Sequence, residues 1–420
     1  MRNIESVGRY LDSHDVAHEV FESDEQRGNL LAEINGTGGK PSLMLGPSHV
    51  DVVPVEDESR WKIPPFEGSV QEDCVWGRGA LDMLYIVAAQ TVAFSRLHLE
   101  GFKPAGDLKL LIVADEESAG TFGAKWMVEK HPKKVAVDYL ITEQGGEPVA
   151  ENKIAYWYGE KGMAWTRIKF RGEQQHGSTP FKSNNAVLKA ALAAKRLGEY
   201  QPPRDTRFIR PILQQLGVSS IARLLAGNRI TLPRVLEAYS KQNLGMTKFL
   251  HALTQMTISP NILVGGTKVN IIPGEAILDV DIRLLPGQTV EDAFEHVKKA
   301  LGSLSREAEI SLIPKEQGGD SFPGTSSNIR SPLVEAMEEV AKELRGPDIE
   351  LVPLMTTGGT DARLFRKAFG TQAYGFALSD GTLDLQTIQG LFHGDDERIP
   401  LGTIDLTTKA YYEIAKRFLA

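Results

Sequence analysis

The chain has 420 residues, of which 41% are hydrophobic and 24% are charged, a composition typical of a globular protein and not of a disordered or fibrous one. Its 55 acidic residues outnumber the 47 basic ones and give a formal net charge of −8, which argues against a general nucleic-acid or anionic-membrane binder because both need a basic face. The single cysteine, Cys74, excludes an intrachain disulfide and a tetrathiolate zinc site.

The N-terminal stretch MRNIESVGRYLDSHDVAHEVFE contains no uninterrupted apolar core and no small-residue cleavage site, so we expect no signal peptide. No segment approaches about 18 consecutive apolar residues, the length of a membrane-spanning helix. We therefore expect a cytoplasmic protein with neither a membrane nor a nucleic acid as partner.

Helical patterns alternate with short apolar runs through about the first 160 residues. The apolar runs are bounded by turn residues, as buried strands are, and read NLLAEI, SLMLG, LKLLIVAD and VDYLIT. The helical patterns read IESVGRYLDSH, DMLYIVAAQTVAFSRLHLEG and GAKWMVEKHP. This alternation predicts an α/β fold with a mostly parallel or mixed sheet covered by helices on both faces, in which ligands bind beyond the carboxyl ends of strands.

The pattern changes near residue 160. GMAWTRIKFRG and EAILDVDIRLLPG alternate as half-exposed strands do, AEISLIPK is a third strand, and NNAVLKAALAAKRL and TVEDAFEHVKKALG are helical. We expect a smaller α+β domain over 161–324, inserted into a catalytic domain of 1–160 and 325–420. Within the insertion, an extra amphipathic helical segment at 200–256 fits either a cap or an interface.

Two glycine-rich stretches resemble nucleotide-binding loops but lack the required residues. INGTGGKP has Ile34 where a phosphate-binding loop begins with glycine, and Pro41 where it needs Ser or Thr for magnesium. GRGALD has Asp82 where the third glycine of a dinucleotide fingerprint must pack a helix on a strand. These departures disfavour a nucleotide-binding protein.

Imidazole and carboxylate side chains follow the predicted strand ends. His49 and Asp51 come after SLMLGP and, at i and i+2 of an extended segment, share one face. The others are Asp82 in GRGALDM, Glu116 and Glu117 after LKLLIVAD, Glu143 after VDYLIT, and His393 in LFHGDDE. Each alone is more often an ordinary solvated residue, but together at one sheet edge they predict a two-metal site.

Charge balance supports this hypothesis. Two divalent zinc ions would be neutralised by Asp82, Glu117, Glu143 and one bridging hydroxide, with both histidines as neutral ligands. Glu116 then remains beside the bridging water as a general base that returns the proton to a leaving amine. The mixed imidazole and carboxylate set favours two Zn²⁺ per subunit, with Co²⁺ or Mn²⁺ as possible substitutes.

Nine motifs carry a resemblance that covers nearly the whole chain. In order they are SHVDVVP, WGRGALDM, VADEE, ITEQG, HGSTP, KVNIIPGEA, VDIR, GGTDAR and HGDDE. They resemble the dizinc peptidase and deacylase family that includes acetylornithine deacetylase, succinyl-diaminopimelate desuccinylase, aminoacylase and glutamate carboxypeptidase. The resemblance implies an α/β/α zinc-hydrolase catalytic domain with an inserted dimerisation or lid domain.

The resemblance also implies a role for each site residue. One zinc would be bound by His49, Asp82 and Glu143 and the other by Asp82, Glu117 and His393, while Asp51 orients His49 and Glu116 acts as the base. In a homodimer, His176 of the HGS motif would reach the partner's site to polarise the scissile carbonyl, with help from Asn270. Arg283 would grip the substrate carboxylate with its two-pronged guanidinium, and Gly359 and Thr360 would line the site with backbone donors.

Two departures from the family pattern bear on the substrate. Leu84-Tyr85-Ile86 stand where the family often has lysine and small residues, which predicts a different pocket polarity. The long segment 200–256 puts a direct transfer of the family's substrates in doubt. We predict zinc-dependent hydrolysis of an amide bond in a small carboxylate-bearing substrate, with N-acyl amino acid deacylation foremost. A dipeptidase or carboxypeptidase is the alternative, and an inactive metal-binding scaffold is the alternative from another class.

Overall fold

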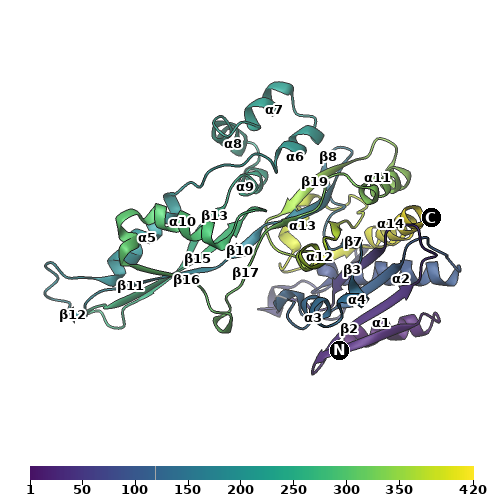
Figure 1. Ribbon diagram of the computed structural model, residues 1–420, viewed down its shortest axis with the longest axis horizontal. Helices are drawn as coiled ribbons and strands as arrows, with labels where there is room; N and C mark the ends of the chain where they lie inside the picture. Colours follow the sequence, from purple (N-terminus) through teal and green to yellow (C-terminus); the bar gives the residue numbers. More distant parts are fainter. Residues whose placement is uncertain (119) are drawn as a thin grey trace.

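A ten-stranded mixed sheet forms the larger part of the computed structural model, which describes residues 1–118 and 120–420 (Figure 1). The strands in order across it are β1 (His18–Asp24), β2 (Arg27–Ile34), β6 (Leu108–Val113), β3 (Leu43–His49), β7 (Tyr139–Thr142), β20 (Gln372–Gly375), β9 (Lys153–Glu160) and β18 (Thr325–Ser326). β19 (Glu350–Thr356) and β8 (Pro148–Ala150) also pair with β9. β3 runs parallel to β6 and β7, whereas β1, β2 and β6 pair antiparallel, so the predicted mixed sheet is confirmed.

Helices cover both faces of this sheet. One face packs with α1 (Arg2–Asp12), α2 (Tyr85–Leu99), α11 (Pro332–Arg345) and α14 (Leu401–Leu419). The other packs with α3 (Ala124–Lys130), α4 (Pro132–Val135) and α12 (Ala362–Phe369). Because both faces are covered, β3 and β6 are buried along their whole length.

A smaller group of elements lies at the end of α2. The turn η2 (Ala80–Leu84) leads into α2, and it packs with α13 (Leu385–Leu391) and with β21 (Arg398–Pro400). β21 forms a three-stranded sheet with β5 (Cys74–Trp76) and β4 (Ser69–Gln71). These contacts bring residues near 80 and near 395 together, far apart though they are in the sequence.

The helix Ala80–Leu99 is, in the described part of the chain, the one helix long and apolar enough to cross a membrane. However, 61% of this stretch is buried inside the protein, and α2 packs against α14 and β3. Its apolar character is therefore that of a core helix.

A second sheet of six strands contains only segments between 162 and 322. Its order is β16 (Ala308–Leu312), β11 (Thr166–Arg171), β15 (Glu275–Leu284), β10 (Gly162–Ala164) and β17 (Ser321–Phe322), with β13 (Thr257–Gly265) also pairing β15. α5 (Ala186–Glu199) and α10 (Val290–Leu301) share its apolar core. α10 begins with a capping box formed by Thr289 and Asp292. Beyond these lies the two-stranded sheet of β12 (Gln175–His176) and β14 (Ile271–Ile272).

The helices of the segment at 200–256 pack on the large sheet, while Tyr200 and Met256 at its two ends contact the second sheet unit. It contains α6 (Arg210–Gln215), α7 (Ser220–Ala226), α8 (Leu232–Ser240) and α9 (Leu244–Ala252). Its buried side chains, such as Ile212 and Leu250, belong to the same apolar cluster as the large sheet, and α6 contacts β19. The segment covers the large sheet and is called the cap below, but it also exposes Ile221, Leu224 and Ile230, so its packing fits a cap and an interface alike.

Lys161 joins this cap to the rest of the protein. Its side chain is fully buried, and its Nζ donates to the carbonyls of Ala252 (2.8 Å) and Gln255 (3.0 Å) and to the Thr257 hydroxyl (3.2 Å). Burial lowers the pKa of Lys161 to about 7, and its amine supplies donors to carbonyls at the C-terminal end of α9 that the helix leaves unpaired. The lysine therefore holds the end of α9 against the junction of the two sheets.

Candidate active site

The imidazole and carboxylate side chains expected at the strand ends converge at one edge of the large sheet. β3 ends at His49, and the neighbouring strands β6 and β7 end shortly before Glu117 and Glu143. His49 Nε2 lies 3.3 Å from Asp82 Oδ1 and 3.9 Å from Glu143 Oε2. His393 Nε2 lies 3.3 Å from both Asp82 Oδ2 and Glu117 Oε1. Asp82 therefore presents one oxygen to each imidazole.

This geometry fits two metal ions that share Asp82. Donor atoms of His49, Asp82 and Glu117 all lie within 4.8 Å of one another. Asp82 Oδ1 and Glu117 Oε1 are buried, and within residues 1–118 and 120–420 neither accepts a hydrogen bond. Buried carboxylate oxygens without a partner are unfavourable unless a cation satisfies them, and the mixed nitrogen and oxygen donor set suits a divalent ion such as zinc.

The charges of the cluster perturb one another strongly. Burial favours the neutral form of His49, but the nearby carboxylates of Asp51 and Asp82 outweigh it and raise the pKa of this imidazole. The nearby carboxylates of Asp82 and Glu117 raise the pKa of His393 to about 10. Each imidazole thus meets concentrated negative charge. Because histidine must be neutral to ligate a metal, metal binding here would displace these protons.

Asp51 ties two of the strand ends together. Its carboxylate accepts the backbone N–H groups of Glu116 (3.1 Å) and Glu117 (3.0 Å), and its Oδ1 lies 3.5 Å from His49 Nδ1. Glu117 faces His393, whereas Glu116 is half-buried beside the neighbouring cleft. Burial raises the pKa of Glu116 to about 8. Asp51 thereby fixes the orientation of the His49 ring and the position of the backbone that carries Glu116.

Residues 47–417, which include the whole cluster and the second sheet, match the peptidase family M20/M25/M40. The chain belongs to this family. The probable succinyl-diaminopimelate desuccinylase of Staphylococcus aureus (strain MRSA252) is 27% identical over 362 residues, which are 84% of this chain and 79% of that protein. The probable carboxypeptidase S-like 2 of Dictyostelium discoideum is 26% identical over 394 residues, which are 90% of this chain and 71% of that protein.

A solved structure confirms the fold of this M20 protein. An M20 family metallo-carboxypeptidase from Sulfolobus solfataricus superposes with a TM-score of 0.73 at 21% sequence identity, covering 99% of this chain and 94% of that chain. The predicted family, the fold class and the assignment as a hydrolase of the metallopeptidase class are confirmed.

A buried ion pair behind the metal-ligand cluster fixes the GGTD loop of this M20 enzyme. Glu160 pairs with Arg366 at 2.6 Å and accepts hydrogen bonds from the backbone N–H and the hydroxyl of Thr360. Thr360, expected to line the site, is therefore already bound to Glu160. Gly359 does line the cleft, and a Cβ there would come within 2.5 Å of the Phe322 ring, which explains the glycine.

His176 and Asn270, predicted to act on the substrate, lie far from the cluster of their own chain. β12, which carries His176, is at the opposite end of the molecule from β3 and β7 (Figure 1). The His176 ring is exposed, and its Nδ1 lies 2.8 Å from the Ser178 hydroxyl. Asn270 is next to it, accepting the Gly177 N–H at 2.7 Å. Neither side chain contacts the metal-ligand cluster within one subunit.

Arg283 has a carboxylate partner within its own strand. Its guanidinium donates to the two oxygens of Asp281 at 2.8 and 3.2 Å. Trp165 Nε1 also donates to Asp281, at 3.1 Å. The two-pronged geometry expected for a substrate carboxylate is thus present, with Asp281 as its partner.

Glu397 was missed by the sequence reasoning although it organises two loops of the site. It is only 1% exposed, and the guanidinium of Arg78 donates to it at 2.5 Å. Three backbone N–H groups also donate to it at 2.8–3.1 Å, those of Gly79, Leu81 and Asp82. Arg78 donates in turn to the His393 carbonyl at 3.2 Å. One buried acid therefore holds the loops that carry Asp82 and His393.

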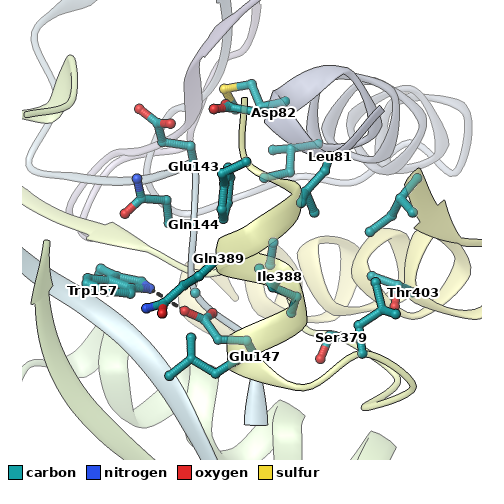
Figure 2. Close-up of a pocket in the computed structure, with 18 of the residues that line it drawn as sticks. Leu81, Asp82, Glu143, Gln144, Glu147, Trp157, Ser379, Ile388, Gln389 and Thr403 are labelled. Atoms are coloured by element: carbon teal, nitrogen blue, oxygen red, sulfur yellow. Dashed lines mark hydrogen bonds between the residues drawn. The ribbon is translucent and has the colours of Figure 1, made fainter. Parts of the chain in front are cut away.

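Two hollows flank the cluster. The cleft on the Glu116 side is lined by three acidic residues, Glu116, Glu117 and Asp320, and by four basic ones, Lys125, Lys315, Arg363 and Lys367. On the side of Asp82 and Glu143 lies a cavity of about 170 Å³ with mainly apolar walls (Figure 2). These walls include Leu81, Tyr85, Ile86, Trp157, Phe249 and Phe392. Tyr85 and Ile86, two of the residues that depart from the family pattern, form part of these walls.

Proposed function

We propose that the chain is a zinc-dependent amidohydrolase that removes the acyl group from a small N-acyl amino acid. The observation that carries the proposal is the convergence of two imidazoles and two further carboxylates around Asp82, with Glu116 beside them. One Zn²⁺ would be held by His49, Asp82 and Glu143 and the other by Asp82, Glu117 and His393. Co²⁺ or Mn²⁺ could take their place.

The proposed chemistry assigns the proton transfers to Glu116. Two bound zinc ions would polarise the scissile carbonyl and acidify a water. Glu116 accepts the proton of the attacking water and delivers it to the leaving amine. Asp51 fixes the position of this base through the Glu116 N–H and orients His49 at the same time.

The substrate carboxylate is assigned to the basic side of the cluster. Beyond Glu116 and Glu117, the cleft carries Arg363 and three lysines against one acid, Asp320, and a carboxylate is stabilised by such an excess of positive charge. Arg283 is the proposed two-pronged partner, exchanging Asp281 for the substrate. Gly359 and Thr360 place their loop at the rim of the same cleft.

A homodimer is part of the proposal. α5 and β13 lie side by side in the second sheet unit and expose five large aliphatic side chains, Leu188, Leu192, Ile262, Leu263 and Val264. An apolar patch of this kind marks an interaction surface. With the patch paired between two copies, His176 and Asn270 would reach the partner's cluster and stabilise the developing oxyanion. A fully active monomer in solution would contradict this role of His176.

The alternatives within the family are a dipeptidase and a carboxypeptidase, and an inactive metal-binding scaffold is the alternative outside it. Relatives named as a desuccinylase and as a carboxypeptidase match the chain at nearly equal identity, so their names favour neither activity. A small-molecule substrate, a cytoplasmic location and the absence of nucleic-acid and membrane partners remain predictions.

Amine release by the zinc-loaded protein tests the proposal. The panel contains N-acetyl, N-succinyl and longer N-acyl amino acids beside unblocked dipeptides, and Glu116→Ala is the background control. Turnover confined to blocked amino acids is the expected result. Turnover confined to dipeptides would replace the deacylase with the peptidase alternative, and no turnover above the control would favour the scaffold.

A further inference from the structure

The cavity beside Asp82 and Glu143 contains an acid that the proposed chemistry does not use. Figure 2 shows Glu147 at the lower end of the cavity and Asp82 at the upper end. Glu147 is only 6% exposed, and its Oε1 accepts a hydrogen bond from Trp157 Nε1 at 2.9 Å. Among the described residues, the cavity wall contains no lysine, arginine or histidine. Burial accordingly raises the pKa of Glu147 to about 7.

A structural role does not account for a carboxylate at this position. The Trp157 N–H needs one acceptor, which the amide oxygen of a glutamine would supply equally well. A buried carboxylate without a cation is unfavourable, and such groups in clefts are candidates for functional sites. The favourable partner that Glu147 lacks inside the described chain can come from a ligand that enters the cavity.

The two hollows indicate which part of the substrate enters. In the cleft on the Glu116 side, four basic side chains and Asp320 lie beyond Glu116 and Glu117, and this excess of positive charge suits the carboxylate of the leaving amino acid. The scissile carbonyl must lie at the cluster. The acyl group is then directed to the other side, into the apolar cavity. A cavity of about 150 Å³ accommodates a benzene-sized molecule, so the 170 Å³ found here suits a short acyl chain.

We infer that this cavity binds the acyl chain of the substrate and that Glu147 recognises a protonated amine at the end of that chain. The inference rests on the proposed function and names its substrate class. Apolar walls hold the methylene groups, and the terminal ammonium gives the buried carboxylate its counter-charge. An acyl chain that ends in a carboxylate, such as succinyl, is disfavoured because it would place a second carboxylate beside Glu147 in a cavity that offers no cation to either.

Matched substrates test this inference. The probes are N-hexanoyl and N-(6-aminohexanoyl) forms of one amino acid, the shorter N-butanoyl and N-(4-aminobutanoyl) pair, and the N-succinyl form. For at least one pair we expect kcat/KM to be about 10- to 100-fold higher for the amine-ended substrate, the usual effect of a hydrogen bond to a charged group. Glu147→Gln should abolish this ratio, because glutamine keeps an acceptor for the Trp157 N–H but gives the ammonium no counter-charge.

The matched control is Glu151→Gln, an exposed glutamate in the turn between β8 and β9, which should keep the wild-type ratio. Calorimetry with free 6-aminohexanoic and hexanoic acids gives a readout independent of turnover, and the preference for the amine should again depend on Glu147. A preference for methyl-ended or succinyl substrates, or a ratio unchanged in Glu147→Gln, overturns the inference while the proposed function stands. If no member of the panel is cleaved, the proposed function fails and the inference with it.

Discussion

Replacing Glu397 by glutamine should weaken both the fold and metal binding. The carboxylate accepts one guanidinium and three backbone N–H donors, and the amide of glutamine would turn an NH₂ group toward some of them. Removing one partner of a buried ion pair costs about 3–5 kcal/mol. We therefore expect Glu397→Gln to lower the free energy of unfolding by about that amount.

The same substitution should affect the metal because the loops held by Glu397 carry Asp82 and His393. Loss of groups that orient metal ligands typically lowers affinity about 10- to 100-fold. Zinc affinity is measured by competition with a chromophoric chelator, and stability by urea unfolding.

Asp395→Asn is the matched control for Glu397→Gln. Asp395 lies in the same loop and pairs with Arg60 at 3.0 Å, but both side chains are exposed, so this variant should lose less than about 1 kcal/mol. If Glu397→Gln matches this control in stability and in zinc affinity, the reasoning about the buried acid is refuted.

Three further predictions concern other buried groups and the metal. Burial raises the pKa of Glu147 from 4.5 to about 7, so stability that is fully present below about pH 4.5 is lost as the pH rises through 7, by about 3 kcal/mol at about 1.4 kcal/mol per pH unit. The free energy of unfolding of Glu147→Gln, measured in urea, should therefore rise relative to that of the wild type between pH 5 and pH 8. A difference between the two proteins that does not change with pH would contradict this. Lys161→Met should lower the melting temperature, because each buried carbonyl left without a donor costs about 1–3 kcal/mol; an unchanged melting temperature would show that α9 does not depend on this lysine. A chelator should lower the melting temperature and zinc should restore it, and Glu116→Ala should keep this response while losing amide turnover; loss of the response would make Glu116 a ligand instead of a base.

The metal-ligand cluster was accessible to sequence reasoning because its members follow consecutive buried strands. The carboxyl ends of β3, β6 and β7 lie at one sheet edge, so His49, Glu117 and Glu143 could be expected near one another. Asp82 and His393 are on loops whose glycine-flanked context made them candidates, and the resemblance to a family then implied which metal each would bind. In both cases local patterns or motifs carried the information.

The supporting residues could not be found in this way. Arg78 and Glu397 are 319 positions apart, and nothing in the pattern of either loop shows that one carboxylate will serve both. Glu147 follows a glycine pair in a polar stretch and has the appearance of a solvated acid. The helical segment at 200–256 shows an apolar face, but such a face does not reveal which of two cores it covers.

The position of Phe249 shows how the packing of that segment bears on substrate selectivity. It sits on α9, within the sequence of the insertion, yet it forms part of the apolar cavity wall together with Trp157 of β9. Arg283 and His176, by contrast, belong to the second sheet unit. The two ends of a substrate would thus be bound by different parts of the chain, one packed on the large sheet and the other in or beyond the second sheet. Substitutions in the cap could retune one end of the substrate while the metal ligands and the grip on the other end stay as they are, which makes α9 a natural position for redesigning the enzyme.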